Sequence, residues 1–518
     1  MARMRAFPYR WFLRLLGAAL LLAWVAIALW QSHKRLPPGV HIAGNWRSVP
    51  AIDVRFLSDL TAADATGAPL HERQINAELL RMIAQARDFL VLDTGLFGDL
   101  PAAGPGASRM RAAAPVAAAL SDALLQARQL QPGLQVLLLI DPTSTRMHLG
   151  TAALERLRAA GVAVVPVDLN RLRAPNAAFS SLWQLCCSWW TADDADGDWP
   201  NPLGVGSPGV SFGLWGGTPG YQRSHRQLLI ADNGAGRLTG LIFSRSLNAE
   251  ASLHTAVALQ LTGGSLEPLL ESEFVVAQFS GWSGGDMQEH AQRLFEQRRH
   301  GAASGISGNS GIGSSSGADA ARVRVLTEAS ITEALLERIN AAGSHDSVEI
   351  AALYLSQREL VRALIDAAWR GATVRVLLDP GKDGYGYERS GLPNRQVASE
   401  LVSASDGAVR VRWYRTHGEQ FSPGFALIRS AGRAWLMVGT AELSRRDLDD
   451  FDLAAAFVAE VPGSAAAGSD ALSWFDTLWY NRAAGGTEYS SDADVYTDAS
   501  QLDYWQYRLL EASGASFD

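Results

Sequence analysis

The chain has 518 residues, of which 47% are hydrophobic and 19% charged, a composition typical of a globular protein with more than one domain. Its net charge of -8 argues against a general nucleic-acid binder, because no basic field gathers phosphates. The two cysteines, Cys186 and Cys187, are adjacent, so neither a structural zinc site nor a disulfide framework is expected. They are predicted to pack as small hydrophobic side chains.

Residues 1–38 are predicted to form an N-terminal transmembrane anchor. An uncharged run extends from Leu15 to Trp30, with basic residues on both flanks. A cleaved signal peptide ending near Ala26-Ile27-Ala28 is the alternative, but the apolar run continues past that point and favours an uncleaved helix. The arginines before the run favour an N-terminus inside the cell. The body is then expected on the periplasmic or extracytoplasmic side of the inner (plasma) membrane.

Residues 50–300 are predicted to form the first domain. Apolar periodicity predicts a helix over 74–86, a buried strand at 89–92 and a strand at 135–140 that ends in Asp-Pro. An insert at about 170–220 carries five tryptophans among Gly, Pro and Asp: Trp183, Trp189, Trp190, Trp199 and Trp215. It is interpreted either as a lid packed on the domain or as an aromatic loop that dips into the bilayer interface.

Residues 322–484 repeat this plan and are predicted to form the second domain. A helix face around 331–339 precedes a strand at 348–354, a helix at 359–369 and another strand that ends in Asp379-Pro380. Such repetition indicates an internal duplication, and alternating helices and strands indicate α/β sheets covered by helices. A Gly/Ser-rich linker at 301–321 separates the halves. An aromatic and acidic tail at 485–518 is expected to dock on the second domain.

One segment in each half carries the chemistry. Residues 224–232 nearly spell His-x-Lys-x4-Asp, with His225 and Asp232 in place and Gln227 at the lysine position. In the second half the corresponding positions hold Ser422, Gly424 and Arg429. Further matching segments follow in order at 241–244, 257–263, 370–371, 379–380, 391–394, 417–421 and 438–443.

Together these segments resemble the phospholipase D superfamily, the group that includes bacterial cardiolipin synthases, with a degenerate second motif. The resemblance implies an α/β fold of two tandem phospholipase D-type αβ sandwich domains after the transmembrane helix. It implies a nucleophilic His225 that forms a phosphohistidine, with Asp232 orienting a histidine. It implies no metal and no cofactor. In the family a second histidine protonates the leaving alkoxide, and lysines bind the phosphate oxygens.

The remaining candidates are substitutes or phosphate contacts. His417 lies five residues before Ser422 and is a candidate replacement acid, although such a histidine can simply belong to its loop. Gln227 can hydrogen-bond a phosphate oxygen without adding charge. Ser422 is a weak candidate nucleophile and phosphate ligand. Hydroxyls at family phosphate-binding positions belong to Ser244, Ser246 and Thr440.

Three functions follow from these residues. The first is a pseudoenzyme that binds an anionic phospholipid head group or a protein partner, with His225 kept by packing. The second is an active phosphatidyltransferase or phosphodiesterase that uses His225, so that whether the chain is an enzyme stays open. The third is a nuclease, which the acidic balance and the anchor disfavour. A phospholipid membrane is the expected partner, no nucleic acid is expected, and a homodimer that brings two His225 together is an alternative.

Overall fold

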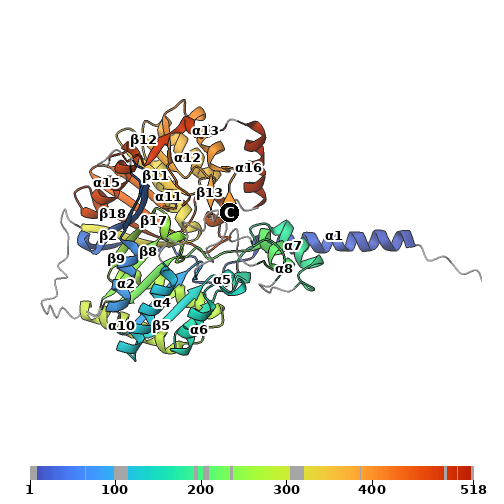
Figure 1. The fold of residues 1–518 in the computed structure, drawn as a ribbon, viewed down its shortest axis with the longest axis horizontal. Coiled ribbons are helices and arrows are strands. Elements are labelled where there is room, and N and C mark those ends of the chain that lie inside the picture. The colour runs from blue at the N-terminus through green and yellow to red at the C-terminus, as the bar shows by residue number, and fades with distance from the viewer. Residues whose placement is uncertain are drawn as a thin grey trace, which may run out of the picture.

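The computed structural model describes residues 9–64, 66–98, 115–191, 197–201, 209–233, 237–303, 320–384, 387–482, 487–496, 498 and 500–514. Most of the linker predicted at 301–321 lies outside these ranges. The chain folds as an α/β protein with two large mixed sheets and helices against them (Figure 1).

The first sheet has eight strands in the order β3-β2-β9-β8-β7-β4-β5-β6. Strands β4, β5 and β6 run parallel, and the other neighbours are antiparallel. Their bounds are β2 (Val54–Ala63), β3 (Pro69–Arg73), β4 (Phe89–Thr94), β5 (Gln135–Ile140), β6 (Ala163–Pro166), β7 (Leu228–Asp232), β8 (Leu238–Phe243) and β9 (Ala256–Thr262).

The second sheet has nine strands in the order β1-β10-β18-β17-β16-β11-β12-β15-β19. Their bounds are β1 (Arg47–Pro50), β10 (Ala320–Thr327), β11 (Ser347–Ala352), β12 (Thr373–Leu378), β15 (Val409–Tyr414), β16 (Phe425–Ser430), β17 (Arg433–Gly439), β18 (Ala455–Pro462) and β19 (Ser490–Asp492). A separate two-stranded ribbon joins β13 (Asp383–Gly384) to β14 (Tyr387–Glu388).

Seven strands of each sheet share one topology. The order β2-β9-β8-β7-β4-β5-β6 in the first sheet corresponds, strand for strand, to β10-β18-β17-β16-β11-β12-β15 in the second. In both, the last three strands are parallel. This shared order is what the predicted internal duplication requires, and it places β7 and β16, which follow the two motif histidine positions, at equivalent places.

Three apolar clusters hold these layers together. The central cluster contains side chains from both sheets, such as Ile230 and Leu427, and also includes α9 (Glu267–Phe279) and α15 (Ala466–Tyr480). One outer cluster joins the first sheet to α2 (Ile75–Gln85), α4 (Val116–Leu130) and α6 (Thr151–Ala159). The other joins the second sheet to α11 (Ala329–Ala341), α12 (Arg358–Trp369), α13 (Asn394–Ala404) and α16 (Gln501–Ser513).

Strand β7 is buried on both faces. Leu228 and Ile230 point into the central cluster, and Leu229 and Ala231 point into the outer one. Since strand side chains alternate between faces, this run of apolar residues fixes the register of the motif strand. The continuous apolar pattern typical of a doubly covered sheet is therefore what positions the residues just before Leu228.

The N-terminal helix α1 (Tyr9–His33) projects from the body (Figure 1). By length and composition it is the one helix in the described part of the chain that could cross a membrane. Its last turns pack against α7 (Ala177–Cys186), which belongs to the Trp-rich insert, and Trp24 donates its indole N–H to the Ala178 carbonyl at 2.9 Å.

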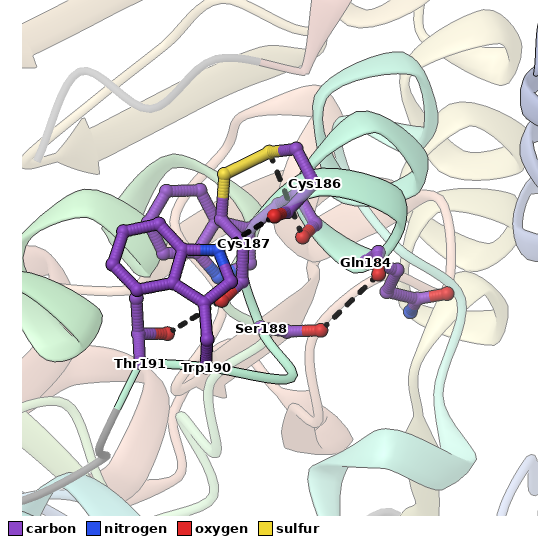
Figure 2. The surroundings of a disulfide bond; sticks show 7 residues. Gln184, Cys186, Cys187, Ser188, Trp190 and Thr191 are labelled. Atoms are coloured by element: carbon purple, nitrogen blue, oxygen red, sulfur yellow. Dashed lines mark hydrogen bonds between the residues drawn. A yellow bond between two sulfur atoms is a disulfide. The ribbon is translucent and has the colours of Figure 1, made fainter.

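The insert corrects one expectation, because Cys186 and Cys187 form a disulfide (Figure 2). Cys186 is the last residue of α7, and Cys187 leaves the helical conformation with φ -130° and ψ -40°. The backbone therefore turns at the bond, which lets the two neighbouring sulfur atoms meet instead of packing separately. The short helices are α5 (Pro142–Arg146), α8 (Phe212–Gly217) and α14 (Arg445–Leu448), and α10 (Gly285–Ala303) precedes the linker.

Candidate functional site

Two aspartates place the two motif segments. Asp141 follows β5, and its carboxylate accepts the Ser224 N–H at 2.8 Å and the Thr143 N–H at 2.7 Å. Asp379 follows β12 and accepts the Phe421 N–H at 2.7 Å and the Gly381 N–H at 2.7 Å. These are the matching Asp-Pro turns of the two halves. Each therefore fixes the residue directly before a motif position, His225 in one half and Ser422 in the other.

Each motif segment then docks on a loop of the opposite half. The His225 N–H donates to the Leu453 carbonyl at 2.8 Å, and the Ser422 N–H donates to the Thr255 carbonyl at 2.9 Å. Leu453 precedes β18 and Thr255 precedes β9, which are equivalent strands. The site is consequently built at the junction of the halves, with His225 beside residues of the second half.

The imidazole of His225 is held by Asp447 of α14. Nδ1 lies 3.0 Å from Asp447 Oδ2, and that same oxygen accepts the Glu442 N–H at 2.6 Å. Asp447 is 2% exposed and His225 is 18% exposed, so a buried carboxylate orients a reachable ring. Because a carboxylate is an acceptor, the neutral ring carries its proton on Nδ1 and its lone pair on Nε2. That is the form that a nucleophile or general base needs.

A second carboxylate, Asp452, lies beside this pair. One ligand atom each of His225, Asp447 and Asp452 falls within 4.8 Å of the others. However, Asp452 accepts the Arg446 Nε–H at 2.5 Å and the Arg223 N–H at 2.6 Å. Burial raises the pKa of Asp452, while Arg446 and His225 lower it. Hydrogen bonds to both oxygens therefore fix the Asp452 carboxylate beside the His225–Asp447 pair.

Arg226 fixes the same segment from the other side. Its side chain is fully buried and donates to Glu273 of α9 at 2.8 Å and to Glu328 at 2.8 Å. It also donates to Ser272 Oγ at 3.0 Å and to the Val40 carbonyl at 3.1 Å. Burial raises the pKa of Glu328 to about 7 against the opposing effect of Arg226. Arg226 thus ties the motif segment to α9, to the second half and to the chain that follows the anchor.

Comparison with known proteins agrees with this geometry. Residues 335–479 match the family model described as "Cardiolipin synthase, PLD-like domain". Over these residues the chain is similar to a phospholipase D-like domain. The match covers most of the second half, which is the half whose motif is degenerate, so the resemblance there rests on the fold-forming pattern and not on the histidine motif.

A solved structure extends the likeness in fold to nearly the whole chain. Phosphatidylserine synthase from Haemophilus influenzae aligns over 95% of this chain and 96% of its own, with 12% identity and a TM-score of 0.51. Nuc from Salmonella typhimurium, a phospholipase D family member, aligns over 34% of this chain and 99% of its own, with 15% identity and a TM-score of 0.25. At these identities the likeness concerns the fold, and the second score supports no argument. No curated protein matches the sequence.

The second motif segment has no room for a side chain at its lysine position. A Cβ at Gly424, the lysine position, would lie 2.1 Å from the Gly439 carbonyl oxygen. Ser422 is buried and donates its hydroxyl to the Ser244 carbonyl at 3.1 Å. Arg429, at the aspartate position, pairs with Glu349 at 3.2 Å. The backbone itself therefore occupies the space in which a lysine would reach a phosphate.

Asp232 forms its described hydrogen bonds with the backbone at the start of β4. Its carboxylate accepts the N–H groups of Arg87, Asp88 and Phe89 at 2.9–3.1 Å. These groups lie at the start of β4, at the opposite end of β7 from His225. Asp232 therefore anchors the entry to β4, while Asp447 holds the His225 ring, and the orienting role expected of Asp232 stays a prediction.

Gln227 is a buried amide close to His225 in the sequence. It lies two residues after His225 and is 8% exposed. Its amide oxygen has no hydrogen-bond partner within the described part of the chain. A buried amide without a partner costs about 1–3 kcal/mol. A ligand group that donates a hydrogen bond would recover that free energy, whereas a phosphate oxygen, which only accepts, would have to bind the amide N–H groups.

The predicted hydroxyl ligands divide into two kinds. Ser244 Oγ accepts the Val257 N–H at 3.0 Å, and Thr440 Oγ1 accepts the Ala455 N–H at 3.1 Å. These matching bonds close equivalent loops after β8 and β17. Both hydroxyl oxygens therefore already accept a structural hydrogen bond from the backbone. Ser246 is half-buried and lies near Gly95, where an added Cβ would be 3.5 Å from its Oγ.

His417 belongs to its own loop between β15 and β16. Its Nδ1 lies 3.6 Å from Glu419 Oε1, and its N–H donates to Glu419 at 3.0 Å. No described hydrogen bond or ion pair joins it to His225 or Ser422. His254 is buried, and burial together with Arg245 and Arg73 lowers its pKa to about 3, so it stays neutral. The role of His417 as a replacement acid stays a prediction.

Asp447, Asp452 and Arg446 were not predicted from the sequence. All three lie in the loop between β17 and β18, which has 15 residues (440–454), against 12 residues (244–255) in the equivalent loop of the first half. Comparing these two loops would have shown that the second carries five acidic residues and the first carries one. The His225 segment docks on this loop of the opposite half, and that docking, which brings these residues to His225, has no local sequence signal.

Proposed function

We propose that this phospholipase D-like protein is anchored in the membrane, binds phospholipid head groups at His225, and is severely impaired in the phospholipase reaction. The observation that carries the proposal is the asymmetry of the site. His225 is oriented by Asp447, while the equivalent position in the second half holds Ser422, whose hydroxyl is bonded to the Ser244 carbonyl.

Such a site keeps the group that attacks the phosphorus and lacks the general acid that protonates the leaving alkoxide. The His225 Nε2 lone pair can approach a phosphodiester phosphorus, and Asp447 would stabilise the imidazolium that forms. The leaving alkoxide then needs a proton. Losing a general acid costs about 10²–10⁴ in rate. With Gln227 and Gly424 in place of lysines, charge on the phosphate oxygens is also less well stabilised.

A cavity between the anchor and the motif supports a lipid ligand. It has a volume of about 510 Å³ and is lined by residues that include Gln31 of α1, Thr143, Arg146, Tyr221 and Gln222. This size falls within the range of small-molecule sites, about 300–1,000 Å³. Arg146 offers a cation for a phosphate, and Gln222 lies three residues before His225. A head group held by a lipid beside α1 would have a short path to the site.

Two features support the proposed membrane side. Basic residues before the apolar run favour the N-terminus inside. The Cys186–Cys187 disulfide belongs to the insert on the other side of the helix, and disulfides persist in oxidising compartments. Both support a body on the periplasmic or extracytoplasmic face of the inner membrane.

The alternative is an active phosphatidyltransferase or phosphodiesterase that works through a phosphohistidine at His225. The intact His225–Asp447 pair favours this alternative, because a histidine without a catalytic role does not need a buried carboxylate to orient its imidazole. In that case water or an alcohol would act in place of a protein acid.

Native mass spectrometry of the full-length protein with phosphatidylglycerol, cardiolipin and phosphatidylcholine separates these functions. We expect bound lipid in the wild type, weaker binding in His225→Ala, and unchanged binding in the control His417→Ala. Products are measured in the same samples. Turnover that disappears in His225→Ala would establish the enzyme, and equal lipid binding by wild type and His225→Ala would refute the head-group site.

A further inference from the structure

The insert shields one side of α1 over its last turns. Every α1 residue from Tyr9 to Leu22 is exposed, whereas Ala23, Trp24, Ile27 and Ala28 are half-buried and Gln31 is buried. This i, i+3, i+4 spacing defines one helical stripe, and it faces α7. The helix and the insert therefore form one packed unit near the body (Figure 1).

Hydrogen bonds fix that unit at several levels. Trp24 donates to Ala178, the Ala174 N–H donates to the Gln31 carbonyl at 3.3 Å, and Arg173 donates to the Lys34 carbonyl at 2.9 Å. Lys34 in turn donates to the Asn170 carbonyl. The insert consequently cannot slide along α1 without breaking backbone-directed bonds.

The exposed part of α1 is too short to cross a bilayer by itself. Residues 9–22 form 14 residues of helix, which at 1.5 Å per residue span about 21 Å. The hydrocarbon core is about 30 Å thick. Arg10 and Arg14 near the start shorten the apolar part further. At least about 9 Å of the core must therefore fall at the level where α1 packs against α7.

The surface of the insert suits that depth. Trp189 is 75% exposed, Trp190 58%, Trp199 41% and Trp215 40%. Phe212 lies among Trp183, Trp190 and Trp199 at ring distances of 5.2–6.2 Å. From the start of α7 to Gly220, in the described residues 177–191, 197–201 and 209–220, Asp198 is the one charged side chain, while Arg171 and Arg173 of the insert precede α7. Exposed indoles of this kind are typical of membrane interfaces.

The backbone at the end of α7 is also satisfied internally. The Trp190 indole N–H donates to the Cys186 carbonyl at 2.7 Å, Thr191 Oγ1 donates to the Cys187 carbonyl at 3.1 Å, and Ser188 Oγ donates to the Gln184 carbonyl at 3.4 Å (Figure 2). Helix ends normally leave carbonyls to water. Lipid cannot supply such bonds, so a helix end in a bilayer needs internal donors.

We propose that the Trp-rich insert around α7 and α8 is embedded in the outer leaflet of the bilayer beside α1. This inference rests on the membrane anchor of the proposed function. It places the cavity lined by Gln31 and Tyr221 directly at the membrane surface, where a lipid head group would enter from the leaflet and not from bulk water.

Photo-crosslinking tests the depth of the insert. A photoreactive diazirine residue replaces Leu20, Trp190 or Trp369, one at a time, in the full-length protein in phosphatidylethanolamine and phosphatidylglycerol nanodiscs. These positions are 53%, 58% and 62% exposed, so they differ in location and not in accessibility. Unchanged unfolding temperatures establish that each variant keeps the fold.

We expect lipid adducts at positions 20 and 190, and none above background at 369 on α12. Adducts at 20 with background at 190 would overturn the inference while leaving the anchor intact. Background at both 20 and 190 would refute the anchor of the proposed function and the embedded insert together.

Discussion

Replacing Arg226 tests how the segment that carries His225 is held. Arg226→Met keeps a long apolar side chain but removes the guanidinium between Glu273 and Glu328, both fully buried. Breaking a buried ion pair by removing one partner costs about 3–5 kcal/mol. Since 1.4 kcal/mol corresponds to a tenfold change in an equilibrium constant, the folding equilibrium constant should fall by a factor of about 10²–10⁴.

The pH dependence of this variant has a defined sign. Burial raises the pKa of Glu328 to about 7, and removing Arg226 takes away a charge that opposes the shift. A carboxyl whose folded-state pKa is raised binds more protons in the folded state, so its contribution is present at low pH and is lost as pH rises through the folded value. The deficit of Arg226→Met should therefore be smaller at pH 5 than at pH 8.

Thermal unfolding of the full-length protein in detergent measures both effects. Arg237→Met is the matched control, because Arg237 is 49% exposed and pairs with Asp53 at 2.5 Å on the surface. Surface pairs contribute about 0–1 kcal/mol. Adding Glu273→Gln and Glu328→Gln to Arg226→Met should restore much of the stability. Equal unfolding temperatures for Arg226→Met and Arg237→Met would refute the reasoning.

Three further predictions concern residues near the site. Burial holds the pKa of His254 at about 3 in the folded state. Between pH 6.5 and pH 3 this side chain is therefore protonated in the unfolded state alone, so the protein loses stability on acidification. His254→Gln should reduce the stability lost between pH 7 and pH 5 by about 2 kcal/mol, measured as a smaller drop in Tm. Gly424→Lys should lower the Tm without raising turnover, because its Cβ would meet the Gly439 carbonyl, and a gain of activity would contradict the closed position. Asp232→Ala should cost about 1–3 kcal/mol through the amides before β4 while lipid binding persists, and a selective loss of binding would return Asp232 to the site.

Much of the fold could be predicted because its strands are buried on both faces. The strand expected at 89–92 is β4, and the strand expected at 135–140 is β5. The helix expected at 359–369 is α12, within one residue. Continuous apolar runs and a strong helical stripe are local signals, so a single sequence carries them.

The site was predicted less completely, because its partners are distant in sequence. His225 and Gln227 follow from the motif, but Asp447 is 222 residues away and reaches His225 only through the crossing of the halves. Asp232 was assigned by motif position, yet the backbone before β4 takes its carboxylate. The cysteines were judged by spacing alone, which could not show that the chain turns out of α7 between them.

The most direct test of the account is the number of head groups released per molecule of full-length protein under excess phosphatidylglycerol. His225→Ala serves as the blank, and bound lipid is measured in the same sample. The account predicts lipid bound to the wild type and release close to that of the blank, since no acid stands where Ser422 lies. Repeated turnover that depends on His225 would contradict the claim that the second half has lost its chemistry.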